Sequence, residues 1–291
     1  MTDPLIQEFV TSDNYRLQGR VWSPSAEPPN GTLVVLHGIQ SHSGWYEYSC
    51  RKLCDDGYQI CFFDRRGSGL NSSERGHASH WQRLVNDVIQ LLTKRRSQQK
   101  HSNHKGPLIL QAMSWGAKLA VVVAALRPDL IDGLALLYPG IKSFVKPTAF
   151  QTIQLKLAKQ IGINRKQIEI PLKEPALFTG EESYQEFIKN DPLALHQVTV
   201  SFLLANWELD RLVDQAAERI KCPVLFMLSG QDQIVDNAAT EAYFERFPTR
   251  QKKMVQYPNA RHTLEFEPNR DQIVTDYVDW LTDLISSQKI S

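Results

Sequence analysis

Six apolar runs, separated by segments with helical patterning, constrain the fold of this chain more than any other feature. The runs are continuous rather than alternating, which is typical of strands that are buried on both faces of a sheet. Between and after them, apolar residues recur at spacings of three and four, as in residues 81–92 and 273–285. This succession predicts an α/β fold with a mostly parallel central sheet and helices on both faces. The runs lie at residues 31–38, 58–63, 107–112, 133–138 and 223–230 and, in a weaker form, at 252–257.

Two other parts of the chain depart from this pattern. Residues 6–10 and 16–22 alternate between apolar and polar side chains, which predicts an antiparallel pair of strands. The regular succession stops after Leu137 and returns near Arg211. The segment between them is rich in proline and carries too many apolar side chains for a solvated loop. Those side chains are Phe144, Phe150, Ile153, Leu157, Ile161, Phe178, Phe187 and Phe202.

This segment predicts an inserted, mainly helical cap (lid) that buries its apolar side chains over one end of the sheet. The α/β core then consists of residues 1–137 and 209–291, and the cap consists of residues 138–208. A helical extension of the core is the alternative.

Charge and cysteine content limit the possible partners. The formal net charge of +1 gives no field that would gather nucleic acid or an anionic membrane. No stretch resembles a secretion signal or reaches the length of a transmembrane segment. The cysteines are too unevenly spaced to predict a disulfide framework or a zinc site. We therefore expect a soluble, cytoplasmic protein that binds no nucleic acid, and the sequence leaves its oligomeric state open. The cysteines are Cys50, Cys54, Cys61 and Cys222.

A serine lies where the run at residues 107–112 gives way to a helical pattern, in the stretch QAMSWGAKLA. This arrangement predicts a nucleophile elbow, a sharp turn that presents the hydroxyl of Ser114 above the sheet. Such a turn needs small residues two positions before and after the serine. Ala112 stands at the first position, where glycine is usual, and Gly116 stands at the second. An ordinary helix start is the alternative interpretation.

A serine hydroxyl becomes a nucleophile when a histidine takes its proton and a carboxylate orients that histidine. Asp232 directly follows the apolar run at residues 223–230, and His262 lies in the loop before the last helical segment. The order Ser114, Asp232, His262 is the order found in α/β-hydrolases. Asp236 is the alternative acid, although its position before a helical pattern favours helix capping.

Acyl transfer also requires two hydrogen-bond donors for the developing oxyanion. The backbone N–H of Trp115, directly after the serine, is one candidate. The second is expected in the loop after residues 31–38, from the backbone N–H of Ile39 or, alternatively, of Gln40. No cluster of side chains predicts a metal site, because the pair His101 and His104 lacks a convincing third ligand.

Longer segments of the chain resemble a known family. Residues 37–46, HGIQSHSGWY, resemble the HGxxxHSGxY segment of monoacylglycerol lipases and related lysophospholipase-like (serine aminopeptidase-type) hydrolases. Residues 64–71, DRRGSGLN, are similar to the D-x-R-G-x-G-x-S stretch of the same group. The segments around Asp232 and His262 also resemble their counterparts, so the resemblance spans the whole core. Departures occur at Ala112, Trp115 and Asn71, where relatives often have glycine, a smaller or thioether residue, and serine.

The resemblance implies an α/β-hydrolase core, a cap inserted after the sixth core strand, no cofactor, and a triad of Ser114, Asp232 and His262. It implies a serine carboxylic-ester hydrolase that acts through an acyl-enzyme on monoacylglycerols, lysophospholipids or similar small-molecule esters with an apolar acyl group. An acyltransferase or a prolyl-type aminopeptidase could use the same triad. The aminopeptidase would need an acidic cluster in the cap, such as Glu181 and Glu182. A non-catalytic binding protein with this fold is the remaining alternative.

Overall fold

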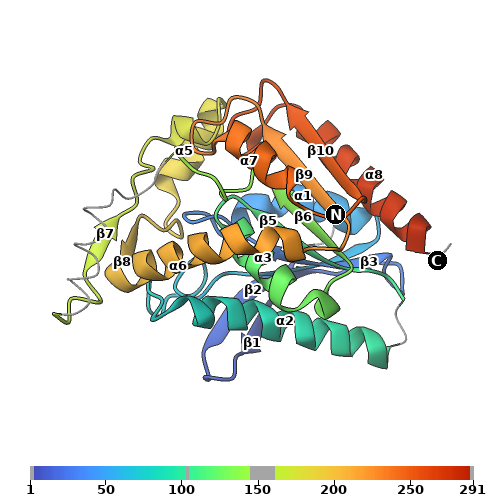
Figure 1. Ribbon diagram of the computed structural model, residues 1–291, viewed down its shortest axis with the longest axis horizontal. Coiled ribbons are helices and arrows are strands. Elements are labelled where there is room, and N and C mark those ends of the chain that lie inside the picture. Colours follow the sequence, from blue (N-terminus) through green and yellow to red (C-terminus); the bar gives the residue numbers. More distant parts are fainter. Residues whose placement is uncertain (1–2, 103–104, 145–160, 289–291) are drawn as a thin grey trace.

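An eight-stranded sheet forms the centre of the protein in a computed structural model that describes residues 3–102, 105–144 and 161–288 (Figure 1). The strand order is β1-β2-β4-β3-β5-β6-β9-β10. β2 pairs antiparallel with β1 and with β4, whereas all the other neighbouring pairs are parallel. The mostly parallel sheet and the antiparallel N-terminal pair are therefore confirmed. The strands are β1 Leu5–Val10, β2 Arg16–Trp22, β3 Gly31–Leu36, β4 Tyr58–Phe63, β5 Leu108–Met113, β6 Gly133–Leu137, β9 Val224–Ser229 and β10 Lys252–Tyr257.

Helices cover both faces of this sheet. α3 packs against α2 and α6, while α1 packs against α8, and Figure 1 shows these as two separate groups. Because the sheet is covered on both sides, every residue of β3, β5 and β9 is buried. The α-helices are α1 Glu47–Asp55, α2 Trp81–His101, α3 Gly116–Leu126, α5 Glu182–Asn190, α6 Val200–Ala216, α7 Asn237–Glu245 and α8 Arg270–Gln288. The 3₁₀ turns are η1 Ser43–Tyr46, η2 Pro128–Leu130, η3 Pro175–Leu177, η4 Ala217–Arg219 and η5 Leu264–Phe266.

The described part of residues 138–208 lies outside the central sheet. It contains α5 and a small antiparallel pair, β7 Gln167–Glu169 with β8 Gln197–Thr199. α6 begins at residue 200, inside the predicted cap, and continues to residue 216 while packing on α3. One helix therefore joins the predicted cap to the predicted core.

Burial of the apolar side chains in this segment is uneven. Phe178 and Phe202 are buried, as predicted. For Phe144 and Ile161 the prediction of burial is wrong, since they are 63% and 71% exposed at the two borders of residues 145–160. Phe187 is 41% exposed. Phe150, Ile153 and Leu157 lie outside the described residues.

Two further features concern the state of the cysteines and the character of the helices. All four cysteines are free, and Cys50, Cys54 and Cys61 are buried. Within the described ranges, no helix combines the length and the apolar character that crossing a membrane requires.

Candidate active site

The turn between β5 and α3 holds Ser114 in a conformation that is uncommon for a residue with a side chain. Its φ angle is 48°, in the left-handed region. The backbone N–H of Ser114 donates to the carbonyl of Leu137 in β6, and its carbonyl accepts from Gly140 and Ala117. The chain thus reverses sharply at the carboxyl edge of the sheet, and α3 begins two residues later at Gly116. This is the geometry of a nucleophile elbow.

Small residues are required around this turn, as predicted. A Cβ atom on Gly116 would lie 2.6 Å from the carbonyl oxygen of His37 and 2.9 Å from that of Leu36. Ala112 is fully buried between Leu36 of β3 and Leu136 of β6, so its single methyl group fits this position. The glycine after the serine is therefore the stricter requirement of the two.

Replacing Gly116 with alanine is expected to lower the free energy of unfolding by about 1–3 kcal/mol, because rigid backbone must move to admit the methyl group. Activity should fall as well, since the same shift displaces Ser114. Gly180→Ala is the matched control, because its Cβ would meet only the Arg261 side chain, at 3.7 Å. Chemical denaturation of both variants checks the prediction, and equal stability of the two would contradict it.

The structure brings together the three residues predicted to form the triad. The Nε2 atom of His262 lies 2.8 Å from the hydroxyl oxygen of Ser114, and its Nδ1 atom lies 2.7 Å from Oδ2 of Asp232. A carboxylate only accepts hydrogen bonds, so Nδ1 carries the proton and Nε2 is free to accept from the serine. His262 and the Asp232 side chain are both buried. This protonation pattern is the one that a general base requires.

The carboxylate of Asp232 is itself held in place. Its Oδ1 atom accepts hydrogen bonds from the backbone N–H groups of Ile234, at 2.8 Å, and Val235, at 2.9 Å, which leaves Oδ2 for the histidine. Asp236, the alternative acid, instead caps α7 by accepting from the N–H of Ala239 at 3.0 Å. The geometry therefore favours Asp232 as the partner of the histidine.

The loop after β3 lies directly against the elbow. A Cβ atom on Gly38 would be 3.3 Å from Cβ of Ser114, so the peptide between Gly38 and Ile39 is close to the nucleophile. On the other side, a Cβ atom on Gly140 would be 3.0 Å from the backbone nitrogen of Trp115. The two predicted oxyanion donors, Ile39 and Trp115, are thus on segments that flank Ser114.

A buried cluster that sequence reasoning missed joins the loop after β3 to the segment after α5. The Nε2 atom of His42 and the indole N–H of Trp45 both donate to Oδ2 of Asp191, at 2.9 Å and 2.6 Å. Burial opposes ionisation of this carboxyl group, but the two hydrogen bonds outweigh it and hold the pKa of Asp191 at about 2. Asp191 therefore keeps its negative charge at physiological pH.

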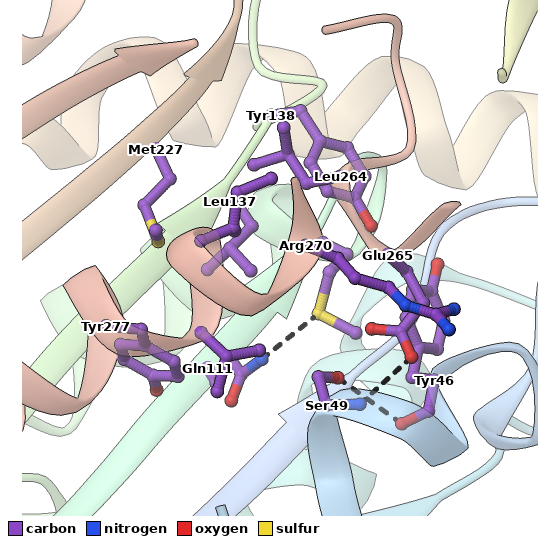
Figure 2. A pocket seen from close by; sticks show the side chains of 13 residues that line it. Tyr46, Ser49, Gln111, Leu137, Tyr138, Met227, Leu264, Glu265, Arg270 and Tyr277 are labelled. Carbon is purple, nitrogen blue, oxygen red and sulfur yellow. Dashed lines mark hydrogen bonds between the residues drawn. The ribbon is translucent and has the colours of Figure 1, made fainter. Parts of the chain in front are cut away.

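A small cavity lies inside the fold beneath the elbow and the histidine loop (Figure 2). Its lining includes Met113, which precedes the serine, Leu264, which follows His262 by two residues, and the Glu265 side chain. The carboxylate of Glu265 accepts from the backbone N–H of Ser49 in the first turn of α1, at 3.0 Å. Glu265 thus ties the histidine loop to the N-terminus of a helix, where negative charge is favoured.

Burial raises the pKa of Glu265 to about 7, although the hydrogen bonds of Ser49 and the charge of Arg270 favour the ionised form. A raised carboxyl pKa means that the folded protein binds this proton more tightly than the unfolded chain. The contribution of Glu265 to stability should therefore fall as pH rises from about 4.5 to 7, by up to about 3 kcal/mol.

Glu265→Gln keeps the acceptor for Ser49 and removes the charge, so this variant should be more stable than the wild type at pH 8. Near pH 4 the difference should largely vanish. Urea denaturation at both pH values measures it, with the exposed Glu182→Gln as the control for net charge. The same difference in stability between Glu265→Gln and the wild type at both pH values would contradict this account of Glu265.

Two other candidate sites from the sequence find no support in the geometry. Glu181 and Glu182 are exposed at the start of α5, which is the pattern of a solvated face. His101 is exposed at the end of α2, and His104 lies outside the described residues. Among the residues that the structure describes, no group of three His, Cys, Asp or Glu side chains is arranged to hold a metal ion.

Comparison with known proteins places the chain among hydrolases. A monoglyceride lipase from Rattus norvegicus is 25% identical over 263 residues, which are 90% of this chain and 84% of that protein. Phospholipase YtpA from Bacillus subtilis is 24% identical and covers 87% of this chain and 95% of its own length. An abhydrolase domain-containing protein from Dictyostelium discoideum, described as uncharacterized, is 24% identical over 98% of this chain, and the chain spans only 30% of its length.

Solved structures share the fold. A soluble variant of the monoglyceride lipase from Saccharomyces cerevisiae superposes with a TM-score of 0.85 at 20% identity, covering 98% of this chain and 96% of that one. A monoacylglycerol lipase from Paleococcus ferrophilus gives a TM-score of 0.81 at 23% identity, with 93% and 100% covered. The α/β-hydrolase fold predicted from the sequence is thereby confirmed.

The sequence profile of one family, Hydrolase_4, described as serine aminopeptidase S33, matches residues 27–269. That range includes the loop after β3, the elbow, the segment expected to form the cap, and the segments carrying Asp232 and His262. The family resemblance expected from the sequence is confirmed, and the chain belongs to the Hydrolase_4 family of α/β-fold serine hydrolases.

Proposed function

We propose that this protein is a serine ester hydrolase that cleaves monoacyl esters through an acyl-enzyme on Ser114. The observation that carries the proposal is the continuous hydrogen-bonded row from Ser114 through His262 to Asp232, with the serine on a strained turn. Three elements that acyl transfer requires meet at one edge of the sheet. They are a nucleophile, a base in the correct tautomer and a fixed carboxylate.

In the proposed reaction, the hydroxyl oxygen of Ser114 attacks the ester carbonyl while its proton passes to Nε2 of His262. The N–H groups of Ile39 and Trp115 bind the resulting oxyanion. The imidazolium then protonates the leaving alcohol, and the acyl-enzyme forms. Water next attacks the acyl group with His262 as base, which releases the fatty acid and restores the serine. Asp232 holds the ring and stabilises its charged form throughout.

Aromatic side chains from the predicted cap favour a substrate with an apolar acyl group. Phe178 lies edge-on to the ring of His262, with centroids 5.9 Å apart, and Phe202 stacks on Trp115 at 5.2 Å. Tyr138, directly after β6, also lies edge-on to His262, with ring centroids 4.9 Å apart. Apolar walls of this kind suit a hydrocarbon chain next to a few polar groups. The relatives described as monoglyceride lipases and a phospholipase favour the same substrate class.

The proposal is tested by comparing three substrate classes on one preparation: 1-monoacylglycerols of increasing chain length, lysophosphatidylcholine, and a prolyl arylamide. We expect hydrolysis of the esters, with a preference for one range of acyl chain lengths, and no release from the arylamide. A flat profile across chain lengths would count against the apolar acyl site. Cleavage of the arylamide alone would replace the proposal with an aminopeptidase. Measuring the wild-type reaction in the presence of an alcohol that can accept the acyl group distinguishes hydrolysis from acyl transfer.

A further inference from the structure

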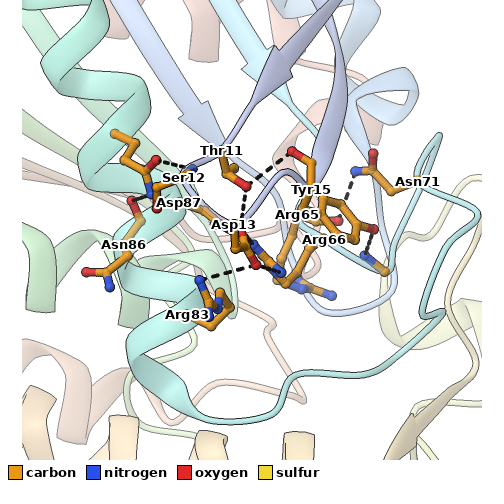
Figure 3. A network of polar contacts seen from close by, with 12 residues as sticks. Thr11, Ser12, Asp13, Tyr15, Arg65, Arg66, Asn71, Arg83, Asn86 and Asp87 are labelled. Carbon is orange, nitrogen blue, oxygen red and sulfur yellow. Dashed lines mark hydrogen bonds and ion pairs between the residues drawn. The ribbon is translucent and has the colours of Figure 1, made fainter.

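Two consecutive arginines, Arg65 and Arg66, follow β4, and Figure 3 shows the network of polar contacts around Arg66. Arg66 forms a bidentate pair with Asp87, with both N···O distances at 2.7 Å, and also reaches Asp13 at 3.1 Å. These carboxylates account for the charge of Arg66 and fix the loop that carries both arginines. Arg65 has no such role in this network, and its function needs a separate explanation.

The guanidinium of Arg65 donates to two backbone carbonyls of the loop after β3. Its Nη1 atom lies 3.1 Å from the carbonyl oxygen of Gly38, and its Nη2 atom lies 3.0 Å from that of Ile39. In a trans peptide the C=O and the following N–H point in opposite directions. Holding these two carbonyls therefore fixes the directions of the N–H groups of Ile39 and Gln40, the two alternatives for the oxyanion donor that this loop supplies.

His37 completes this arrangement. Its Nδ1 atom lies 2.8 Å from the carbonyl of Gly38, so Nδ1 carries the proton, and its Nε2 atom accepts from the backbone N–H of Arg65 at 2.9 Å. Burial, followed by the charge of Arg65, lowers the pKa of His37 well below its ordinary value, which keeps the ring neutral. The carbonyl oxygen of Gly38 thus accepts two hydrogen bonds, one from His37 and one from Arg65, which hold the peptide plane between Gly38 and Ile39.

The same guanidinium also lies over the aromatic rings behind the second donor. Its central carbon is 4.7 Å from the ring centroid of Trp115 and 5.4 Å from that of Phe202. The indole N–H of Trp115 is bonded to Asn206 of α6 at 2.7 Å, so this ring is fixed on its far edge as well. A flat guanidinium can stack on rings and donate to two acceptors together, which a lysine cannot.

We propose that Arg65 is a positioning residue for the oxyanion site, setting the loop that carries Ile39 and packing against the ring of Trp115. The inference rests on the proposed ester hydrolysis and extends it to a side chain that does not touch the substrate. Because its bonds are made before substrate arrives, Arg65 should affect binding of the transition state far more than binding of the substrate.

The test compares Arg65→Met and Arg65→Lys with Arg96→Lys in hydrolysis of a p-nitrophenyl ester and in inhibition by an aryl trifluoromethyl ketone. Arg96 is a matched control, since it is partly buried, donates to the carbonyl of Leu130 at 3.1 Å and lies at the far end of α2. For Arg65→Met we expect kcat to fall about 10- to 100-fold with KM nearly unchanged. The inhibition constant of the ketone, whose adduct places an oxyanion at the serine, should rise by a similar factor.

Arg65→Lys should lie between the methionine variant and the wild type, and Arg96→Lys should retain wild-type kinetics. The proposal is overturned if Arg65→Lys and Arg96→Lys show the same kcat and the same ketone inhibition. It is also overturned if the losses in the Arg65 variants appear in KM alone or follow their melting temperatures. An inactive wild type would refute the proposed function itself, so the two failures can be told apart. If Arg65→Met does not fold, the lysine variant carries the comparison.

Discussion

Ser114→Ala is expected to lower kcat for ester hydrolysis by about 10⁶-fold, because the methyl group leaves the histidine with no hydroxyl to activate. In the proposed mechanism Ser114 and His262 act as one unit, so removing either should abolish nearly all of the triad's contribution. The fold should survive, since alanine fits the turn whose neighbours already include Ala112 and Gly116. Steady-state hydrolysis of a chromogenic ester measures the loss, and the melting temperature reports on folding.

Ser97→Ala is the control for this variant, because Ser97 is exposed on α2. It should retain wild-type activity. If Ser114→Ala kept more than about a hundredth of the wild-type rate, the hydroxyl could not be the nucleophile, since an acyl-enzyme requires it.

Asp232→Asn is expected to lower kcat by about 10⁴-fold, and the hydrogen bonds of Asp232 give the reason. The N–H groups of Ile234 and Val235 require an acceptor, so the amide oxygen of the asparagine should stay with them. Its NH₂ group then faces His262 and forces Nδ1 to accept. The proton moves to Nε2, where the ring can no longer take the proton of Ser114.

Asp236→Asn is the matched control, four residues further along the chain. Asparagine caps a helix about as well as aspartate, so the bond to the N–H of Ala239 should persist. We expect near-wild-type kinetics and stability for this variant. A larger loss in Asp236→Asn than in Asp232→Asn would assign the acid role to the other carboxylate.

The sequence was informative where function depends on local pattern. The continuous apolar runs predicted the parallel strands, because a strand that is covered on both faces has no polar positions to alternate. Ser114, Asp232 and His262 could be proposed because each follows a strand end, and parallel strands bring their carboxyl ends to one edge. Helix capping by Asp236 followed from its position before an amphipathic segment in the same way.

Contacts between distant segments could not be predicted from one sequence. Asp191 meets His42 across 149 positions, and nothing in its own neighbourhood distinguishes it from a solvated aspartate. The pairing of Glu265 with the first turn of α1 spans 216 positions. Arg65 and Arg66 are adjacent and chemically identical, yet only the folded chain shows that one meets carboxylates and the other meets backbone carbonyls.

The most direct test of the proposed activity is the intact mass of the folded protein after treatment with a fluorophosphonate, followed by peptide mapping. We predict one adduct per chain, on the peptide that contains Ser114, with no adduct in Ser114→Ala and slow formation in Asp232→Asn. Such a result would demonstrate an activated serine at the elbow. A folded wild type that gains no mass, or an adduct that persists in Ser114→Ala, would contradict the proposal that Ser114 is the nucleophile.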